Sequence, residues 1–186
     1  HNGIIENYAS LKEELISRGH EFKSDTDTEV LVHLIEDVKT ETGANLFDAV
    51  RIALNEVVGA YAIVVIDKNN PNQLIAAKKS SPLVIGIGSD GDYFLASDAT
   101  PIIEYTKNVV YLEDEEIALL IQGKDLKIVT IQNQTKTPYV QELEMHLEVL
   151  EKGGYDSFML KEIYEQPRSI HDCFRGRMNL QKGFIK

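Results

Sequence analysis

The stretch His1-Asn2-Gly3-Ile4-Ile5-Glu6-Asn7 opens the chain, and a helical pattern follows it directly. In this stretch the apolar pair Ile4-Ile5 lies between polar, turn-favouring residues. Asn-Gly is a strong signal for a tight turn because both residues tolerate positive φ. In such a turn a backbone N–H and a side-chain amide can point the same way, as stabilisation of an oxyanion requires. The pair therefore predicts either an ordinary turn or two donors for a developing negative charge.

Three amphipathic helical patterns follow this stretch. Residues 8–18 carry apolar side chains at helical spacing and stop at Gly19, a natural helix end. A second helix has its apolar stripe between Val30 and Val38 and ends at Gly43. A third begins after Asn45, a favourable N-cap residue. These patterns predict helices that each bury one face.

Strand patterns replace the helical ones from Gly59 onward. Ala60–Asp67 is a nearly continuous apolar run, which predicts a strand buried on both faces. A short helix is predicted over Ala99–Tyr105. Helices followed by a largely antiparallel meander indicate the α+β class. The further strands are expected at Gln73–Lys78, Leu83–Ile87, Tyr93–Ala96, Asn108–Leu112, Glu116–Gln122 and Lys127–Gln132.

The tail of the chain has a different character. Residues 133–153 are polar and irregular, which predicts an extended or flexible crossing. Tyr155–Phe174 is predicted to be a long helix interrupted by Pro167. Residues 176–186 have no core pattern and are interpreted as the start of a linker.

Composition excludes several classes of function. The formal net charge of −11 argues against a nucleic-acid surface, which needs basic clusters to neutralise phosphate. No apolar run approaches the length of a membrane span, so no membrane partner is expected. Cys173 is the only cysteine, so no internal disulfide forms, and a cytoplasmic location is the simplest expectation.

Other candidate sites are weak. Gly86, Gly88 and Gly91 spell G-x-G-x-x-G, but a strand rather than a helix follows, which favours a hairpin turn over a dinucleotide loop. Cys173 and His171 point apart on a helix, so they form no nucleophile–base pair. The five histidines are scattered with no metal-ligand spacing, so neither a metal nor a cofactor is expected. They are His1, His20, His33, His146 and His171.

The run Ser24-Asp25-Thr26-Asp27-Thr28-Glu29 places three acids at the start of the second helix. One interpretation is N-capping, since acids and Thr at a helix start satisfy free N–H groups and oppose the dipole. The other is a carboxylate directed at the ammonium group of a small ligand. Both hold together if one acid caps the helix while another binds.

His1–Asn7 together with Ser24–Val30 resembles the glutaminase domain of the class II glutamine amidotransferases. The segment Lys161–Pro167 is the most specific. It separates the chain from the asparagine synthetases and the amidophosphoribosyltransferases, which share only the earlier motifs. The resemblance covers nearly the whole chain, from His1 to about Pro167. It narrows to the glutamine–fructose-6-phosphate aminotransferase family, the glucosamine-6-phosphate synthases, at Gly59–Ala62, Ser81–Gly86, Ala96–Asp98 and Leu160–Pro167.

This resemblance implies a four-layer αββα sandwich of the N-terminal-nucleophile hydrolase type. In that family an N-terminal cysteine attacks the side-chain amide of glutamine, its own α-amino group acts as base, and a glutamyl thioester is hydrolysed. The ammonia passes to a sugar-isomerase domain that makes glucosamine 6-phosphate from fructose 6-phosphate. The implied division is a partial glutaminase domain over 1–153, its terminal helical segment over 154–175, and the linker over 176–186.

Three residues match the family's site. Asn2, through its side-chain amide, and Gly3, through its backbone N–H, match the oxyanion-hole pair. Asp27 matches the carboxylate that receives the α-ammonium group of L-glutamine. Such a carboxylate favours glutamine over amides without the amine, because a buried, unpaired charge is unfavourable.

The departures from the family pattern lead to further expectations. The nucleophilic cysteine, the arginine for the glutamine carboxylate and the sugar-isomerase domains are not in this sequence. We therefore expect a truncated, incomplete sandwich that is inactive by itself, with open sheet edges that promote self-association or poor stability. The resemblance implies a homodimeric parent that contacts fructose 6-phosphate only through the absent domains. The alternative is a non-catalytic glutamine- or amino-acid-binding module of the same fold.

Overall fold

The computed structural model describes residues 1–143, 152–174, 178–179 and 184–185. The chain divides into two units, His1–Glu144 and Met145–Lys186. No helix among the described residues is long and apolar enough to cross a membrane. Residues 144–151 of the predicted polar crossing lie outside the described residues. The second unit contains α5 (Phe158–Phe174), with Pro167 inside it, and the paired strands β11 (Met178–Asn179) and β12 (Phe184–Ile185).

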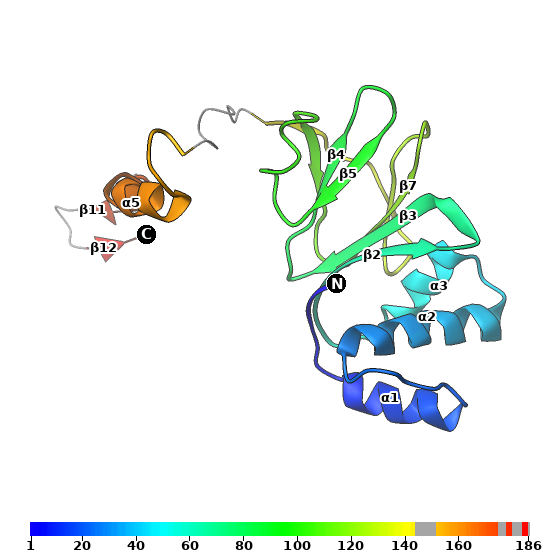
Figure 1. Cartoon of the computed structure of the whole chain (residues 1–186). Helices are drawn as coiled ribbons and strands as arrows, with labels where there is room; N and C mark the ends of the chain where they lie inside the picture. Colours follow the sequence, from blue (N-terminus) through cyan, green and yellow to red (C-terminus); the bar gives the residue numbers. More distant parts are fainter. Residues whose placement is uncertain (144–151, 175–177, 180–183, 186) are drawn as a thin grey trace. The chain divides into compact units, whose positions relative to one another are not determined.

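The first unit has helices on one side of a pair of antiparallel sheets. Figure 1 shows α2 and α3 along β2 and β3, with β4 and β5 on the opposite side of these strands. The helices are α1 (Tyr8–Ser17), α2 (Asp27–Thr42) and α3 (Leu46–Ala53). One sheet has the order β1 (Asn2–Ile5), β2 (Gly59–Asp67), β3 (Asn70–Lys79), β7 (Glu116–Ile121), β8 (Lys127–Thr130) and β9 (Thr135–Lys136). The other has the order β10 (Gln141–Glu142), β6 (Asn108–Tyr111), β4 (Val84–Ile87) and β5 (Tyr93–Ala96). The predicted α+β class is therefore confirmed.

The helix boundaries follow from capping chemistry. The Thr26 hydroxyl accepts a hydrogen bond from the N–H of Glu29 at 3.4 Å and caps α2, as the sequence predicts for this run. Gly43 ends α2 in the left-handed conformation at φ 66°, and its N–H donates to the carbonyl of Lys39. The Asn45 side chain accepts from the N–H of Asp48 at 3.0 Å and caps α3. The three predicted helices are confirmed.

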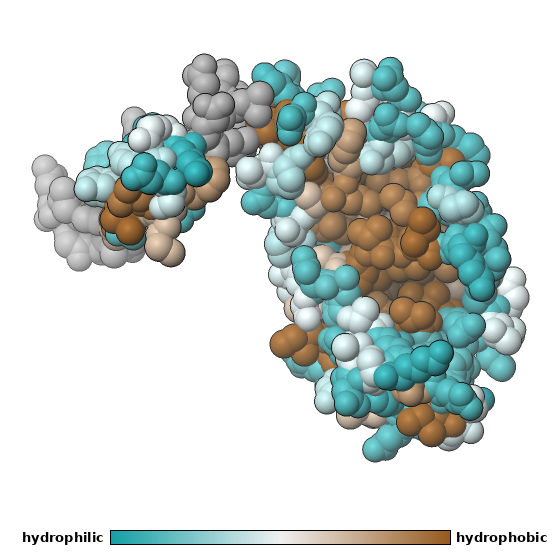
Figure 2. Space-filling view, viewed as in Figure 1, coloured by the Kyte–Doolittle hydropathy of each residue, from teal (hydrophilic) through white to brown (hydrophobic). Residues whose placement is uncertain are grey.

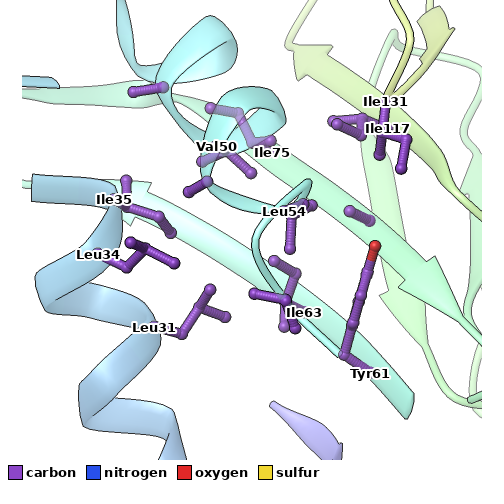
Figure 3. Close-up of a cluster of buried hydrophobic side chains, with 14 of the residues drawn as sticks. Leu31, Leu34, Ile35, Val50, Leu54, Tyr61, Ile63, Ile75, Ile117 and Ile131 are labelled. Atoms are coloured by element: carbon purple, nitrogen blue, oxygen red, sulfur yellow. The ribbon is translucent and has the colours of Figure 1, made fainter. Parts of the chain in front are cut away.

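The first core lies between the helices and one face of the six-stranded sheet. Figure 3 shows the side chains of α2 and α3 directed toward β2 and β3, with Tyr61 and Ile63 of β2 facing them. Tyr61 and Ile63 are only 1% and 2% exposed. The residues drawn there include Leu31, Leu34, Ile35, Val50, Leu54, Ile75, Ile117 and Ile131, all members of one buried cluster.

The second core lies between the two sheets and is incompletely covered. Ala62 of β2 packs in it, but Val64 and Ile66 on the same face of the strand are 44% and 60% exposed. The prediction that this strand is buried on both faces is therefore wrong, because the second sheet covers only part of the face. Figure 2 shows the result as a broad apolar area on the surface of the first unit.

Two other local predictions are also wrong. The predicted helix at 99–105 is a series of turns, in which Ile102 and Thr106 pack over Gly86 of β4. The Thr106 hydroxyl donates to the carbonyl of Ile87 at 2.7 Å and fixes the segment there. Asn2-Gly3 forms no turn either, since both residues lie in β1.

Candidate functional site

Asp27 stands at the first position of α2 without capping the helix. Thr26 supplies the cap, and the Glu29 carboxylate accepts hydrogen bonds from the N–H groups of Lys23 and Ser24 at 2.8 and 2.6 Å. The Ser24 hydroxyl, followed by these N–H groups, lowers the pKa of Glu29 to about 2, so its carboxylate is charged at neutral pH. The acidic run therefore divides its roles. Glu29 binds the backbone of the loop before α2, and Asp27 takes no part in capping the helix.

Asp27 is directed at β1. Its Oδ2 accepts a hydrogen bond from the backbone N–H of Ile5 at 2.9 Å. Its Oδ1 lies 3.7 Å from Nδ1 of His1, and that same nitrogen contacts the Thr28 hydroxyl at 2.8 Å. The Asp27 side chain keeps 22% of its surface exposed. A carboxylate is therefore fixed beside the first strand and is still accessible from solvent.

The alternation of a strand indicates on which side of β1 the N–H of Gly3 lies. N–H groups alternate between the two sides of a strand. The N–H of Glu6 donates to the carbonyl of Val58, just before β2, at 2.8 Å, whereas the N–H of Ile5 donates to Asp27 on the other side of the strand. Gly3, two residues before Ile5, therefore presents its N–H along the Asp27 side, about 7 Å away along the strand. No described strand pairs with β1 on that side, since β1 is the edge of its sheet.

Gly3 is required by its backbone geometry. Its φ is +110°, and a Cβ added there would lie 2.1 Å from the carbonyl oxygen of Ala60. Gly59 on the partner strand has φ +128°, and its added Cβ would lie 2.2 Å from the carbonyl oxygen of Ile4. The two strands therefore approach each other where neither position tolerates a side chain.

Asn2 is exposed and lies opposite Ala62, so its side chain is on the partly open face of the sheet. Its side-chain amide makes no hydrogen bond to the residues that the structure describes. The structure thus brings Asp27 to the strand that carries Asn2 and Gly3. Sequence reasoning missed His1 as a neighbour of Asp27, because no local pattern links residues so far apart in the chain.

An open groove of about 830 Å³ adjoins this arrangement. It is lined by His1 and Thr28, by residues 63–67 of β2, and by Lys68 and Asn69 after that strand. The face of α2 that includes Val32 lines it as well. Asp27 itself does not line the groove, but its two neighbours His1 and Thr28 do.

The other candidates of the sequence fall elsewhere. Cys173 is exposed on α5, in the second unit. Gly86, Gly88 and Gly91 belong to the β4–β5 hairpin, where the N–H of Gly88 donates to the carbonyl of Asp92 at 2.8 Å, so the predicted hairpin turn is confirmed. The prediction that the histidines are scattered is wrong for one pair, because Nδ1 of His20 and Nδ1 of His33 lie 3.0 Å apart.

Comparisons with known proteins identify the family. Residues 1–104 match the family described as "Glutamine amidotransferase domain". A glutamine–fructose-6-phosphate aminotransferase (isomerizing) of Bacteroides thetaiotaomicron is 62% identical over 97% of this chain and 29% of its own length. The enzyme of the same name from Chlorobaculum tepidum is 50% identical over 100% of this chain and 30% of its own length. The chain therefore spans under a third of the curated relatives that it matches.

Solved structures give the same family relationship. The glutamine phosphoribosylpyrophosphate amidotransferase of B. subtilis, complexed with ADP and GMP, superposes with a TM-score of 0.58 at 28% identity. That match covers 70% of this chain and 28% of the other. Its fold is the N-terminal-nucleophile hydrolase type that the sequence resemblance implies, with mixed helices and two antiparallel sheets. By sequence and by fold, the chain belongs to the glutamine amidotransferase domain family.

Proposed function

We propose that this chain is the glutamine-binding part of the glutamine-hydrolysing domain of a glutamine–fructose-6-phosphate aminotransferase. The observation that carries the proposal is the contact between Asp27 and β1, the strand of Asn2 and Gly3. The relatives of that name match along nearly the whole chain and support the choice of enzyme. The complete enzyme supplies the ammonia for making glucosamine 6-phosphate from fructose 6-phosphate.

The proposed roles follow from the two ends of glutamine. Asp27 receives the α-ammonium group, while the Gly3 N–H and the Asn2 amide stabilise the oxyanion that develops on the side-chain carbonyl. An extended glutamine separates these groups by roughly 5–6 Å, close to the spacing of about 7 Å between the N–H groups of Gly3 and Ile5 along β1; Asp27 accepts the N–H of Ile5. The hydrogen bond from Ile5 holds the Asp27 carboxylate in this orientation.

We further propose that these 186 residues do not hydrolyse glutamine by themselves. The family mechanism needs a cysteine whose own α-amino group is free to act as base. Cys173 is the only cysteine of the sequence, and its amino group is part of a peptide bond within α5. We also propose that the parent enzyme is a cytoplasmic homodimer. Sedimentation of the full-length gene product tests the dimer.

The decisive experiment measures glutamate release from L-glutamine by the full-length gene product and by the 186-residue chain. We expect activity only in the former, with Asn2→Ala lowering kcat about 10²–10³-fold. Asp27→Asn should mainly raise KM for glutamine, while Asp25→Asn, an exposed neighbour, should change neither parameter. An active full-length enzyme that is indifferent to Asp27→Asn would contradict the proposed role of Asp27.

The second candidate function, a non-catalytic glutamine-binding module, is favoured by one observation, that the only cysteine is placed on α5. It predicts that the full-length product binds glutamine by calorimetry yet releases no glutamate. Glutaramate, which lacks the α-amine, distinguishes real recognition from adventitious binding in both cases. It should bind more weakly than glutamine to the unmodified protein, and the difference should shrink in Asp27→Asn.

A further inference from the structure

Two histidines face each other where the loop after α1 meets α2. Nδ1 of His20 and Nδ1 of His33 are 3.0 Å apart, and their rings meet edge to face at 77°. Both side chains are mostly buried, 16% and 17% exposed. Glu36, one helical turn after His33, brings Oε2 to 3.9 Å from the same Nδ1 of His33. One ligand atom from each of the three residues lies within 4.8 Å of the others.

The outer nitrogens of both rings face carboxylates. Nε2 of His20 lies 3.3 Å from Oδ1 of Asp37, and Nε2 of His33 lies 3.6 Å from Oε1 of Glu29. A neutral imidazole has one N–H, and a carboxylate beside one nitrogen favours the proton on that nitrogen. Both Nδ1 atoms then present lone pairs to each other at 3.0 Å. Such a pair is repulsive unless a positive charge lies between the two atoms.

The neighbouring contacts hold this arrangement in place. Asp37 is buried, and its Oδ2 accepts a hydrogen bond from Nη1 of Arg18 at 2.6 Å, while its Oδ1 faces His20. Phe22 packs against the His33 ring with centroids 4.4 Å apart. Histidines that bind metals typically donate their other N–H to a carboxylate in the same way, which fixes the tautomer and the ring orientation.

We propose that His20, His33 and Glu36 form a binding site for Zn²⁺. Two imidazoles and one carboxylate are a donor set that zinc accepts, whereas Mg²⁺ and Ca²⁺ prefer oxygen alone. Zinc–nitrogen bonds of about 2.0–2.1 Å place two tetrahedral ligands about 3.3 Å apart, so the two rings need to separate by only a few tenths of an ångström. Glu36 is 68% exposed, which leaves a solvent-facing position for a water ligand.

A metal ion here ties two segments together. It links the loop after α1 to α2, and the loop continues into Ser24 and the capped start of α2 at Thr26. His33 lies under two helical turns from Asp27, so the ion would stabilise the segment that positions Asp27 without touching the proposed glutamine site. The proposal assigns the ion a structural role, and it does not depend on the proposed hydrolytic function.

The test is calorimetric titration of the metal-free 186-residue chain with ZnCl₂, together with visible spectra of the Co²⁺-loaded protein. We expect one ion per chain and an intense, tetrahedral-type Co²⁺ spectrum. His20→Gln and His33→Gln should each weaken binding at least about 100-fold, and Asp37→Asn about 10–100-fold by releasing the His20 ring. Circular dichroism in the absence of metal checks that each variant is folded.

Glu36→Gln keeps the result interpretable, because this exposed side chain is not needed for folding. It should weaken Zn²⁺ binding about tenfold, whereas Glu41→Gln, exposed on the same helix, should leave binding unchanged, as should His171→Gln in the second unit. Zinc binding that is equally tight in the His20→Gln/His33→Gln double variant, or absent from the unmodified chain, overturns the proposal. A shared proton between the two histidines then explains their approach.

Discussion

The two faces of β2 both carry apolar residues, but one face is buried and the other is largely exposed to solvent. Tyr61 and Ile63 are covered by α2 and α3 and are nearly inaccessible, whereas Val64 and Ile66 are 44% and 60% exposed. The difference arises from what lies opposite each face. The helices α2 and α3 cover the first face, but on β2 the second sheet reaches only as far as Ala62. Apolar sequence alone therefore does not indicate burial, because burial depends on the coverage that the rest of the fold supplies.

This contrast bears on the candidate site. Ile5 of β1 is fully buried on the helix side, while Ile4 next to it is 67% exposed on the other. The helix side therefore fixes the position of β1, and the edge of β1 stays accessible to a ligand. A strand anchored on one face and open on the other can present Gly3 and Asn2 without moving.

The largest expected effect is a difference in stability between the same substitution made on each face of β2. Ile63→Ala should lower the free energy of unfolding by about 3–4 kcal/mol, because it leaves a cavity in the closed core. Ile66→Ala, the same change on the open face, should cost less than about 0.5 kcal/mol. Urea denaturation of the two variants measures both values. Equal losses would mean that the open face is covered in solution.

The next effect concerns how β1 is held. Gly3→Ala should destabilise the first unit by about 3 kcal/mol, since the new Cβ meets the carbonyl oxygen of Ala60 at 2.1 Å and φ is +110°. Gly43→Ala is the matched control, because its φ is +66° but nothing lies within 4 Å of an added Cβ. Its loss should be only about 1 kcal/mol. Thermal and urea unfolding give the two values, and similar losses would show that strain alone, without the collision, explains Gly3.

A third, smaller effect tests how closed the helix face is. Burial, reinforced by the carboxylates of Glu115 and Asp114, raises the pKa of Tyr61 to about 12. The unfolded chain releases this proton near pH 10, so the stability that Tyr61 contributes is complete below pH 10 and is lost as the pH rises toward 12, at about 1.4 kcal/mol per pH unit. Tyr61→Phe should remove this loss and should unfold less readily than the unmodified protein above pH 10.

Near pH 7 the same variant should change stability by less than about 1 kcal/mol. The reason is that the Tyr61 hydroxyl has no hydrogen-bond partner among the described residues. Urea midpoints of both proteins between pH 7 and pH 11.5 give the comparison. Parallel pH profiles would mean that the hydroxyl is in contact with solvent.

The smallest expected effect on stability comes from a substitution that should clearly change self-association. Ile66→Ser should leave the unfolding free energy within about 0.5 kcal/mol of the unmodified chain. It should reduce concentration-dependent self-association, because it replaces an apolar side chain of β2 that is 60% exposed. Sedimentation velocity over a range of concentrations measures this. A monodisperse monomer in both proteins would disprove the association expected from the sequence.

Much of the fold could be predicted because its signals are local. The three helices follow from apolar spacing with Thr26, Gly43 and Asn45 at their ends, and the glycines between β4 and β5 indicate their hairpin. The turns at 99–105 were misread as a helix because Ile102 and Thr106 are fixed by packing on Gly86 of another segment. Contacts of that kind leave no periodic pattern.

The roles proposed for Asn2, Gly3 and Asp27 come from local alternatives that only the family resemblance joined into one site. Nothing local to Asp27 indicates that its carboxylate accepts the N–H of Ile5, and nothing local to Gly3 indicates φ +110° inside a strand rather than a turn. The approach of His20 to His33 was missed for a related reason, since one lies in a loop and the other on a helix. Pairs of this kind become apparent only once the tertiary fold is known.

The facing glycines of β1 and β2 bear on how a mutational scan of this domain should be interpreted. Positions 3 and 59 should be about equally intolerant of every substitution, although only Gly3 is proposed to contact a substrate. A map of lost activity would mark both as one active-site patch. A parallel map of protein abundance would assign their intolerance to folding, and Asn2, whose side chain is exposed, would stand out as depleted in activity at normal abundance.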